Sequence, residues 1–319
     1  MESLVYILLA SYNGEKYIET QLESLLSQTY TNWCLLIRDD GSTDCTLGII
    51  EKYIKRDARI KLVDENDLNK GKGACQNFHN LIKVAVAQEA SFIFFCDQDD
   101  YWFPDKVEKM MHVVDKSHKP TMLYSSFFYA DNNLKKLPKH VQEIRSSFLK
   151  PSFKRVIVQN TVYGCTMMIN YQLAEKCLPI PLEAENHDYW IALVATGIGA
   201  KIDHLDIPLM LYRQHDNNVS GNYNDHSNLS RVKRLFMNWN SMKKVQWEKI
   251  KMINTVAEQL KNELLPKNLE LLEGYLNVIK YNNIRLISFC IKYGIKRHSF
   301  LSTIVFYFVL CSLPKVKQN

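Results

Sequence analysis

The chain has 319 residues, of which 46% are hydrophobic and 11% aromatic, so it carries enough apolar material to bury a large core. This composition is typical of a globular protein. The net charge of +6 reflects Lys and Arg residues that gather after about Arg231. No recognised nucleic-acid-binding motif accompanies this charge, so we expect no nucleic-acid partner.

Eight cysteines are scattered along the chain without CxxC or Cys/His ligand spacing, and several lie within apolar runs. Such side chains usually behave as small buried hydrophobes. We therefore expect reduced cysteines and a cytoplasmic protein. The N-terminus lacks the basic flank and the cleavage site of a signal peptide, so residues 4–10 are predicted as a first strand.

The first 130 residues alternate between short β-rich runs and segments with helical periodicity. Strands are predicted at residues 4–10, 33–38, 60–63 and 92–96. Between the first two strands, Ile18, Leu22 and Leu25 recur at helical spacing, and a similar pattern follows the second strand. This alternation predicts a parallel sheet covered by helices.

Later in the chain, strands are predicted at residues 122–130 and 164–170, and helices at 171–178 and 187–196. From about Leu229 onward the pattern is helical, with no strand signal. We therefore predict an α/β protein with a mostly parallel central sheet flanked by helices and an α-helical C-terminal extension.

The apolar run at residues 300–313 is shorter than the roughly 20 residues needed to span a bilayer, and basic residues flank it. A segment of this kind fits an anionic membrane surface, which would place the protein peripherally on the inner face of the cell membrane. A solvated basic face on ordinary helices explains the same pattern. Both interpretations stay open.

In an open parallel sheet, ligands bind beyond the carboxyl ends of the strands. Three loops at predicted strand ends carry polar and acidic side chains, and we expect them to line one crevice. They are Ser11-Tyr12-Asn13-Gly14, Asp39-Asp40-Gly41-Ser42-Thr43-Asp44 and Asp97-Gln98-Asp99-Asp100.

The third loop places Asp97 and Asp99 one residue apart directly after an apolar strand. Two carboxylates at this spacing can hold Mg²⁺ or Mn²⁺ while leaving positions open for phosphate oxygens. The alternative is an acidic turn in which Asp caps the helix that starts near Pro104.

Asp39 and Asp40 also have two interpretations. Their carboxylates could form local hydrogen bonds in a turn, or accept the N3–H group of a uracil or thymine ring. Tyr12 could stack on such a base or pack as a loop aromatic. Lys72, between Gly71 and Gly73, could approach phosphate, although a Gly-Lys-Gly segment is often only a flexible turn.

Four motifs in this order and spacing resemble the family 2 glycosyltransferases with the GT-A fold, from about Leu4 to Gly221. They are Ala10-Ser11-Tyr12-Asn13-Gly14, Ser27-Gln28-Thr29-Tyr30, Arg38-Asp39-Asp40-Gly41-Ser42-Thr43-Asp44 and the segment from Asp97 to Lys106. The last motif, together with His187-Asp188-Tyr189-Trp190 and Tyr212-Arg213-Gln214-His215, further resembles the bacterial rhamnosyltransferases of cell-surface polysaccharide synthesis.

The resemblance implies a role for each matching position. Tyr12 and Asp40 match the nucleoside contacts, with Ser11 and Asp39 beside them. Asp99 matches the principal metal ligand, and Asp97 flanks the donor sugar, its diphosphate and the metal. Asp188 matches the catalytic base. Arg213 and His215 match a segment that closes over the diphosphate or the metal.

The implied catalytic domain spans residues 1–228, with a nucleotide-binding half at 1–130 and an acceptor-binding half at 131–228. The helical region at 229–319 follows it. Trp102, His187 and Trp190 could line the acceptor path, since flat aromatic faces suit sugar rings, although single aromatic residues are more often part of the core.

The sequence departs from the family pattern in two places. The Gly-rich loop lacks the Arg that often faces the nucleotide, which leaves Lys72 as its substitute, and the Gln-x-x-Arg-Trp motif of processive members is missing. We therefore predict an inverting enzyme that moves a single sugar, with dTDP-L-rhamnose as the donor, to a glycan or lipid-linked acceptor.

Three alternatives stay open in the sequence. The first is a glycosyltransferase that uses a UDP-linked hexose. The second is a nucleotidyltransferase, although that class is expected to have a Gly-rich loop directly after the first strand, and this loop contains only Gly14. The third is a nucleotide-sugar-binding protein without activity.

Overall fold

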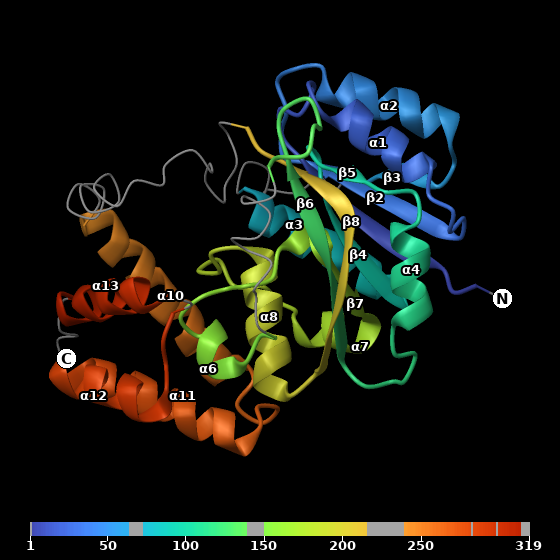
Figure 1. The fold of residues 1–319 in the computed structure, drawn as a ribbon. Coiled ribbons are helices and arrows are strands. Elements are labelled where there is room, and N and C mark those ends of the chain that lie inside the picture. Colours follow the sequence, from blue (N-terminus) through green and yellow to red (C-terminus); the bar gives the residue numbers. More distant parts are fainter. Residues whose placement is uncertain are drawn as a thin grey trace.

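The structure is a computed structural model, and it describes residues 2–63, 73–138, 150–215, 239–281, 283–297 and 299–313. An eight-stranded sheet with the order β3-β2-β1-β4-β7-β6-β8-β5 forms its centre (Figure 1). The strands are β1 Val5–Ser11, β2 Trp33–Asp39, β3 Ile60–Leu62, β4 Phe92–Asp97, β5 Tyr101–Trp102, β6 Thr121–Ala130, β7 Met167–Asn170 and β8 Lys201–Arg213.

The half of the sheet formed by β3, β2, β1 and β4 is parallel throughout. Strand β1 lies in the middle of this half, and its side chains are almost all buried. A strand with helices on both faces of its sheet needs this continuous apolar run instead of an alternating one. The predicted strands at residues 4–10, 33–38, 60–63 and 92–96 are confirmed, each within one residue at either end.

The predicted mostly parallel sheet is confirmed, since four of its seven strand pairings are parallel, but the other half of the sheet is mixed. Strand β7 runs antiparallel to both β4 and β6, and β5 runs antiparallel to β8, whereas β6 and β8 are parallel. The predicted strand at 164–170 starts only at Met167, because Gly164–Thr166 form the 3-10 turn η1. The long strand β8 was not predicted.

Helices cover both faces of the sheet. On one face, α1, α2 and α4 pack over a cluster that includes Leu22, Ile50 and Met110. On the other face, α3, α7 and α8 pack together with the C-terminal helices. The helices of the α/β part are α1 Ile18–Leu26, α2 Thr46–Arg56, α3 Ala74–Ala87, α4 Lys106–Val113, α6 Phe153–Val156, α7 Tyr171–Lys176 and α8 His187–Ile198.

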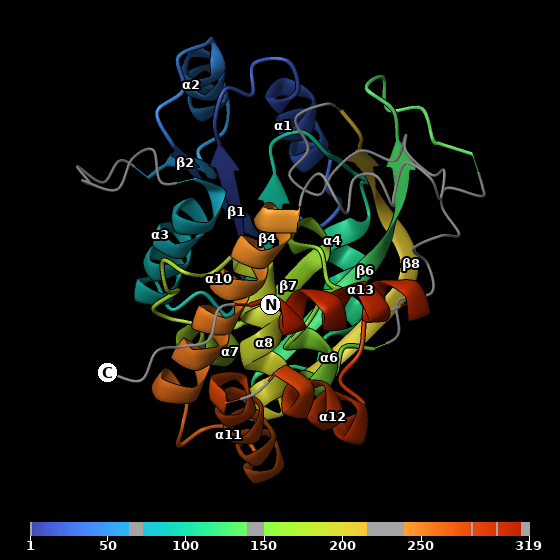
Figure 2. The ribbon, with the colours of Figure 1, turned by 90° about the vertical axis from the view of Figure 1, so that its left-hand side faces the viewer.

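The helical C-terminal extension is confirmed, and it consists of α10 Trp239–Gln259, α11 Pro266–Tyr281, α12 Asn283–Tyr293 and α13 Phe300–Cys311. Figure 2 shows these helices gathered beside α8. One hydrophobic cluster runs from Trp190 of α8 through Ile253 and Leu272 to Leu310 of α13. The extension is therefore anchored through a shared core, while the predicted division at residue 228 stays a prediction.

None of the helices in the described part of the chain is long and apolar enough to cross a membrane. Five cysteines are buried, as expected for side chains that act as small hydrophobes. They are Cys34, Cys96, Cys165, Cys177 and Cys290.

Candidate functional site

The three polar loops meet at one edge of the sheet, because β1, β2 and β4 are parallel and end level with one another. In the register of the sheet, Ser11 lies beside Asp39, and Ala10 lies beside Asp97. The last residue of β8, Arg213, reaches the same edge, where its backbone N–H donates to Asp100 at 3.1 Å. We call this region the strand-end edge.

Ser11 and Asp39 hold each other and the following turn. The Ser11 hydroxyl donates to Asp39 Oδ1 at 2.9 Å, and the backbone N–H groups of Gly41 and Ser42 donate to Asp39 Oδ2 at 3.0 and 2.7 Å. The local hydrogen bonds expected of Asp39 are therefore present. Its carboxylate shapes the loop in which Asp40 lies.

Asp40 is buried and reaches across to the loop before α3. Its Oδ2 accepts the backbone N–H of Gly73 at 2.9 Å, and its Oδ1 lies 3.8 Å from a guanidinium nitrogen of the buried Arg38. Gly73 has φ of 86°, which a residue with a side chain rarely adopts. The predicted contact residue Lys72 lies outside the described residues.

Tyr12 is 55% exposed, so its ring is available to a ligand. Its backbone is fixed by Gln98, whose Oε1 accepts the Tyr12 N–H at 3.0 Å and whose Nε2 donates to the Tyr12 carbonyl at 2.9 Å. A Cβ at Gly14 would lie 2.2 Å from Gln98 Oε1, so a larger residue there would displace this amide from its present position. The first and third loops are thus joined by one amide.

The third loop concentrates negative charge. Burial, with the nearby carboxylates of Asp99 and Asp188, raises the pKa of Asp97 to about 7. Burial, with the carboxylates of Asp99 and Asp97, raises the pKa of Asp100 well above its usual value, and its Oδ2 has no hydrogen-bond partner among the described residues. Ligand atoms of Asp97, Asp100 and Cys165 lie within 4.8 Å of one another.

The end of β8 closes over Asp99. His215 Nε2 lies 2.6 Å from Asp99 Oδ2, and Arg213 Nε donates to the Asp99 carbonyl at 2.6 Å. Tyr17, just before α1, stacks on the His215 ring at 4.9 Å between centroids, and the Arg213 guanidinium lies 4.8 Å over the same tyrosine ring. The predicted neighbourhood of Asp99, Arg213 and His215 is therefore present.

The alternative in which the acidic residues cap the following helix is not observed. Helix α4 begins at Lys106, and its N-cap residue Asp105 makes no capping hydrogen bond with its side chain. Asp99 instead binds His215.

Asp188 enters the site from the first turn of α8. The backbone N–H of Gly164 donates to its Oδ2 at 3.1 Å, while its Oδ1 has no hydrogen-bond partner among the described residues. Burial raises the pKa of Asp188 to about 7. A carboxylate that titrates near neutral pH and keeps one oxygen uncommitted is suited to accept a proton.

Three predicted acceptor contacts are buried side chains. Trp102 and Trp190 are fully buried, and the Trp190 indole N–H donates to the Cys177 carbonyl at 2.7 Å. The His187 ring packs against Phe78 at 3.9 Å between centroids, and burial lowers the pKa of His187 to about 3. These positions favour a packing role, and a direct acceptor contact stays a prediction.

The sequence predicted no individual role for four residues that build the site: Tyr17, Gln98, Asp100 and Lys106. Gln98 and Asp100 lie in the acidic loop that was expected to line the crevice. The fully buried Lys106 donates to the Cys165 carbonyl at 2.6 Å and lies 3.8 Å over the Trp102 ring. Its place in the motif from Asp97 to Lys106 was a signal, because a lysine a few residues after the acidic loop can supply a nearby counter-charge.

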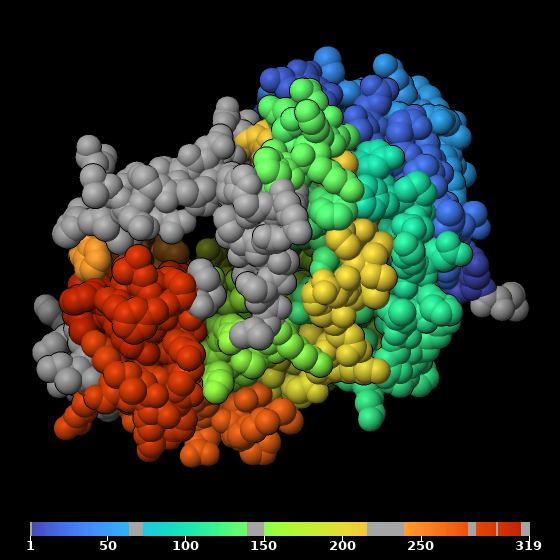
Figure 3. All heavy atoms as spheres, in the orientation of Figure 1, coloured from blue at the N-terminus to red at the C-terminus, as the bar shows by residue number. Residues whose placement is uncertain are grey.

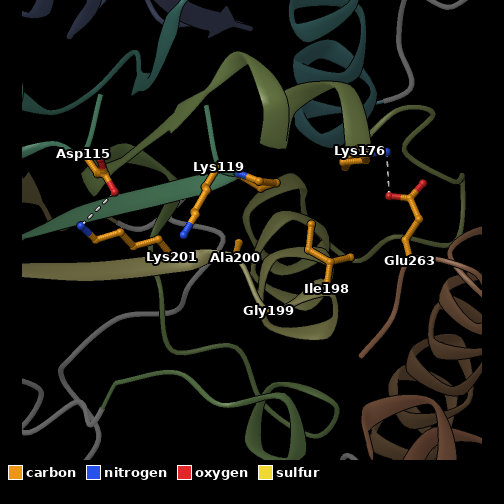
Figure 4. A pocket seen from close by; sticks show the side chains of 9 residues that line it. Asp115, Lys119, Lys176, Ile198, Gly199, Ala200, Lys201 and Glu263 are labelled. Atoms are coloured by element: carbon orange, nitrogen blue, oxygen red, sulfur yellow. Dashed lines mark hydrogen bonds and ion pairs between the residues drawn. The ribbon is translucent and has the colours of Figure 1, made fainter. Parts of the chain in front are cut away.

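A hollow of about 690 Å³ lies elsewhere (Figure 4). It is lined by Pro120 and Lys201, where β6 and β8 begin, so it lies at the opposite end of these strands from Arg213. Lys201 pairs there with Asp115 at 3.1 Å, and Lys176 pairs with Glu263 at 2.8 Å. This hollow is not part of the strand-end edge.

Comparison with known proteins decides the family. The model described as Glycosyl transferase family 2 matches residues 6–177, which is more than half of the chain. The chain belongs to glycosyl transferase family 2. It is therefore an enzyme that transfers sugars from nucleotide-sugar donors, and the nucleotidyltransferase and the inactive binding protein are no longer alternatives.

Relatives in the family carry different donor names. The dTDP-rhamnosyl transferase RfbG of Shigella flexneri is 28% identical over 223 residues, which cover 67% of this chain and 73% of that protein. The UDP-Glc:alpha-D-GlcNAc-diphosphoundecaprenol beta-1,3-glucosyltransferase WfaP of Escherichia coli is 29% identical over 220 residues, which cover 69% and 80%. An uncharacterized glycosyltransferase of Haemophilus influenzae is 27% identical and covers 92% of both chains.

Solved structures of glycosyltransferases share the fold. S. aureus TarS 1-349 in complex with UDP-GlcNAc matches with a TM-score of 0.54 at 18% identity, over 92% of this chain and 93% of that one. The mannosyltransferase PcManGT from Pyrobaculum calidifontis, in complex with GDP-Man and Mn2+, matches with a TM-score of 0.53 at 13% identity, over 91% and 74%. The predicted GT-A fold is thus confirmed.

The acidic loop of this family 2 enzyme fits a divalent cation. Carboxylates as close as those of Asp97, Asp99 and Asp100 repel one another, and the Asp100 Oδ2 has no partner among the described residues. Hard cations prefer carboxylate oxygens, so Mg²⁺ or Mn²⁺ suits this donor set better than a metal that seeks thiolates.

Proposed function

We propose that this family 2 glycosyltransferase inverts the configuration of a single sugar, most readily L-rhamnose from dTDP-L-rhamnose, as it transfers it to a glycan or lipid-linked acceptor. The proposed setting is the synthesis of a cell-surface polysaccharide. The observation that carries the proposal is the meeting of Tyr12, Asp40, Asp97, Asp99 and Asp188 around one edge of the sheet.

The nucleoside is proposed to bind between the first two loops. The exposed Tyr12 ring would stack on the base, and the Asp40 carboxylate would accept its N3–H group. Ser11 and Asp39 hold the Asp40 backbone in place, since the Asp40 N–H donates to the Ser11 carbonyl at 2.9 Å. This arrangement suits both thymine and uracil, which present the same N3–H group.

The diphosphate is proposed to lie over the third loop. Asp99 and Asp97 would hold Mg²⁺ or Mn²⁺, with His215 beside them, and the bound cation would neutralise the charge on the departing diphosphate. Arg213 adds a fixed positive charge next to Asp99.

Asp188 is proposed to take the proton of the acceptor hydroxyl as that oxygen attacks the anomeric carbon from the face opposite the nucleotide. Its Oδ2 is oriented by Gly164, and its Oδ1 is the basic atom. Attack from the opposite face inverts the configuration at the sugar carbon.

A UDP-linked hexose is the second candidate donor. It is supported by the relative named as a UDP-Glc glucosyltransferase and by the structural neighbour in complex with UDP-GlcNAc. To test the donor, the protein is incubated with Mn²⁺ and dTDP-L-rhamnose, UDP-glucose or UDP-GlcNAc, and the nucleotide released is measured with and without an acceptor. Release from dTDP-L-rhamnose alone supports the first proposal, and release from a UDP-sugar alone overturns it in favour of the second.

Peripheral attachment to an anionic membrane surface is also proposed. Phe300, Leu301 and Phe308 of α13 are all more than half exposed, and Lys292 and Lys296 lie exposed nearby. Figure 3 shows α13 on an open face of the molecule. An apolar face flanked by cations is the usual chemistry of a helix that lies on lipid.

A further inference from the structure

Two cations, the buried Lys249 and the half-buried Arg297, lie together where α8, α10 and the segment before α13 meet. Lys249 of α10 is 7% exposed, and its ammonium group pairs with Glu185 at 3.1 Å. The same group lies 5.2 Å from the centroid of the Tyr189 ring. The Arg297 guanidinium interacts electrostatically with Lys249, Glu185 and Tyr189, so it belongs to the same cluster.

The cluster carries more positive than negative charge. Glu185 is the one carboxylate found to act on both cations among the described residues, and it is partly exposed. Burial lowers the pKa of both Lys249 and Arg297, as expected for cations that lose water without full compensation. A buried charge that is not matched destabilises a fold, so an excess of this kind suggests a missing anion.

Hydrogen-bond donors without acceptors surround the two cations. Arg297 Nε, the Tyr189 hydroxyl and the Gln246 side-chain N–H group have no partner in the described part of the chain. Gln246 precedes Lys249 by three residues, so the two share one face of α10. The buried Tyr275 hydroxyl of α11, which acts electrostatically on Tyr189, also has no partner.

Each buried donor of this kind costs roughly 1–3 kcal/mol when it stays unpaired. Arg297 Nε, which belongs to one of the two cations, and the three neutral donors beside it lack acceptors that an anion with several oxygens would supply. Phosphate and diphosphate esters have this chemistry.

The position of the cluster relates it to the acceptor. Tyr189 directly follows Asp188, and Glu185 acts electrostatically on the Asp188 carboxylate. On the other side, the Arg297 guanidinium lies 6.0 Å from the centroid of Phe306, on the buried face of α13. The opposite face of α13 exposes Phe300 and Phe308. A ligand held here would have its anion near the candidate base and an apolar surface close by.

We propose that Lys249, Arg297, Tyr189, Gln246 and Tyr275 bind the phosphate or diphosphate group of a lipid-linked acceptor, and so place its sugar hydroxyl beside Asp188. The proposal rests on the proposed function, because it assumes that Asp188 receives the acceptor. It adds a phosphate site for the acceptor that is separate from the site for the donor diphosphate at Asp99.

The kinetic test compares two acceptors that carry the same sugar and the same short polyprenyl chain, one joined through a diphosphate and the other through an uncharged ether. Arg297→Gln and Lys249→Met are expected to raise KM for the diphosphate acceptor about ten- to a hundredfold. KM for the ether acceptor and for the donor is expected to stay unchanged. Lys251→Met, on the exposed side of α10, is the matched control and should change none of them.

A binding test does not depend on turnover. The native protein and each variant are sedimented with phosphatidylcholine vesicles that contain polyprenyl diphosphate, with vesicles that contain phosphatidylglycerol, and with phosphatidylcholine alone. Native protein should bind the polyprenyl diphosphate vesicles in preference to the others, and both variants should lose this preference.

Several results would overturn the site. Equal KM changes for both acceptors would show that the cations only support the fold. Loss of binding to phosphatidylglycerol with unchanged binding to polyprenyl diphosphate would assign the cluster to membrane lipid. If the native protein transfers no sugar from any donor yet binds polyprenyl diphosphate through Lys249 and Arg297, the proposed function fails and the phosphate site stands.

Discussion

Replacing Asp188 by Asn tests the assignment of the catalytic base. Asn is nearly the same size, and its side-chain oxygen can still accept the N–H of Gly164 that now binds Asp188 Oδ2 at 3.1 Å. The variant cannot accept a proton, so turnover should fall by about 10²- to 10⁴-fold. Affinity for the nucleotide should stay the same, because Tyr12 and Asp40 are unchanged.

The pH dependence provides a second measurement. The pKa of Asp188 is about 7, and its basic form is the carboxylate, so native kcat/KM should rise as the pH increases through about 7. The remaining activity of Asp188→Asn should lack this rise. Asp97 has a similar pKa, so the native profile alone does not identify the group responsible for the rise. The comparison of the native profile with that of Asp188→Asn does.

The free energy of unfolding should change in the opposite direction to kcat/KM and fall as the pH rises. The folded-state pKa of Asp188 lies above its usual value of 3.8, so the protonated form favours the fold and this contribution is lost as the pH rises from about 4 through about 7. At about 1.4 kcal/mol per pH unit, the loss is at most roughly 4 kcal/mol. The Asn side chain does not titrate, so the melting temperature of Asp188→Asn at pH 8 should equal or exceed that of the native protein.

Three measurements on one preparation decide the matter: nucleotide release, titration with the nucleoside diphosphate, and melting temperature at pH 5 and 8. Near-native turnover of the Asn variant would refute the assignment of the base. Weak nucleotide binding or a lower melting temperature at pH 8 would show that Asp188 mainly supports the structure.

Other substitutions test the remaining parts of the site. Asp99→Ala should abolish sugar transfer and weaken Mn²⁺ binding measured by electron paramagnetic resonance about tenfold or more, since it removes a charged ligand; unchanged Mn²⁺ affinity would move the metal site elsewhere. Tyr12→Ala should raise the KM of the donor about ten- to a hundredfold by removing ring stacking, with kcat little changed, whereas Tyr12→Phe should behave as the native protein. Phe300→Ser combined with Phe308→Ser should reduce sedimentation with phosphatidylglycerol vesicles while the melting temperature stays within about 2 °C, because both side chains are exposed; full binding by this variant would argue against a membrane surface at α13.

The parallel half of the sheet could be predicted well because its strands are buried on both faces. Strands β1, β2 and β4 appear in the sequence as continuous apolar runs between helical segments, and that pattern has few other interpretations. The three acidic and polar loops followed from the same reasoning, since the ends of parallel strands share an edge.

Strand β8 was harder to predict, because it is exposed over much of its first half and is irregular. Apart from Ile202, its buried residues begin only at Leu209, and its pairing with β6 shifts register around Ser126 and Pro208. The directions of the strands in the mixed part of the sheet were not predicted, for a related reason. Strand β7 is only four residues long, and its direction depends on contacts with β4 and β6 that lie far apart in sequence.

Within the candidate site, the residues whose chemical type suggests contact with a ligand were easier to predict than the residues that hold those side chains in position. Nothing in the local sequence indicates that Tyr17 stacks on His215, because the two are joined only when β8 reaches the strand-end edge. The cluster around Lys249 and Arg297 could not be predicted either, since both residues look like ordinary members of a basic C-terminal region.

The side-chain amide of Gln98 couples the loop around Tyr12 to the acidic loop in which Gln98 lies. Because its two hydrogen bonds hold the Tyr12 backbone, a shift of one loop is passed to the other. An exchange of donor specificity by grafting the loop around Tyr12 from a relative would therefore disturb the carboxylates as well. Such a chimaera should be built with both loops and the glycine at position 14 transferred together.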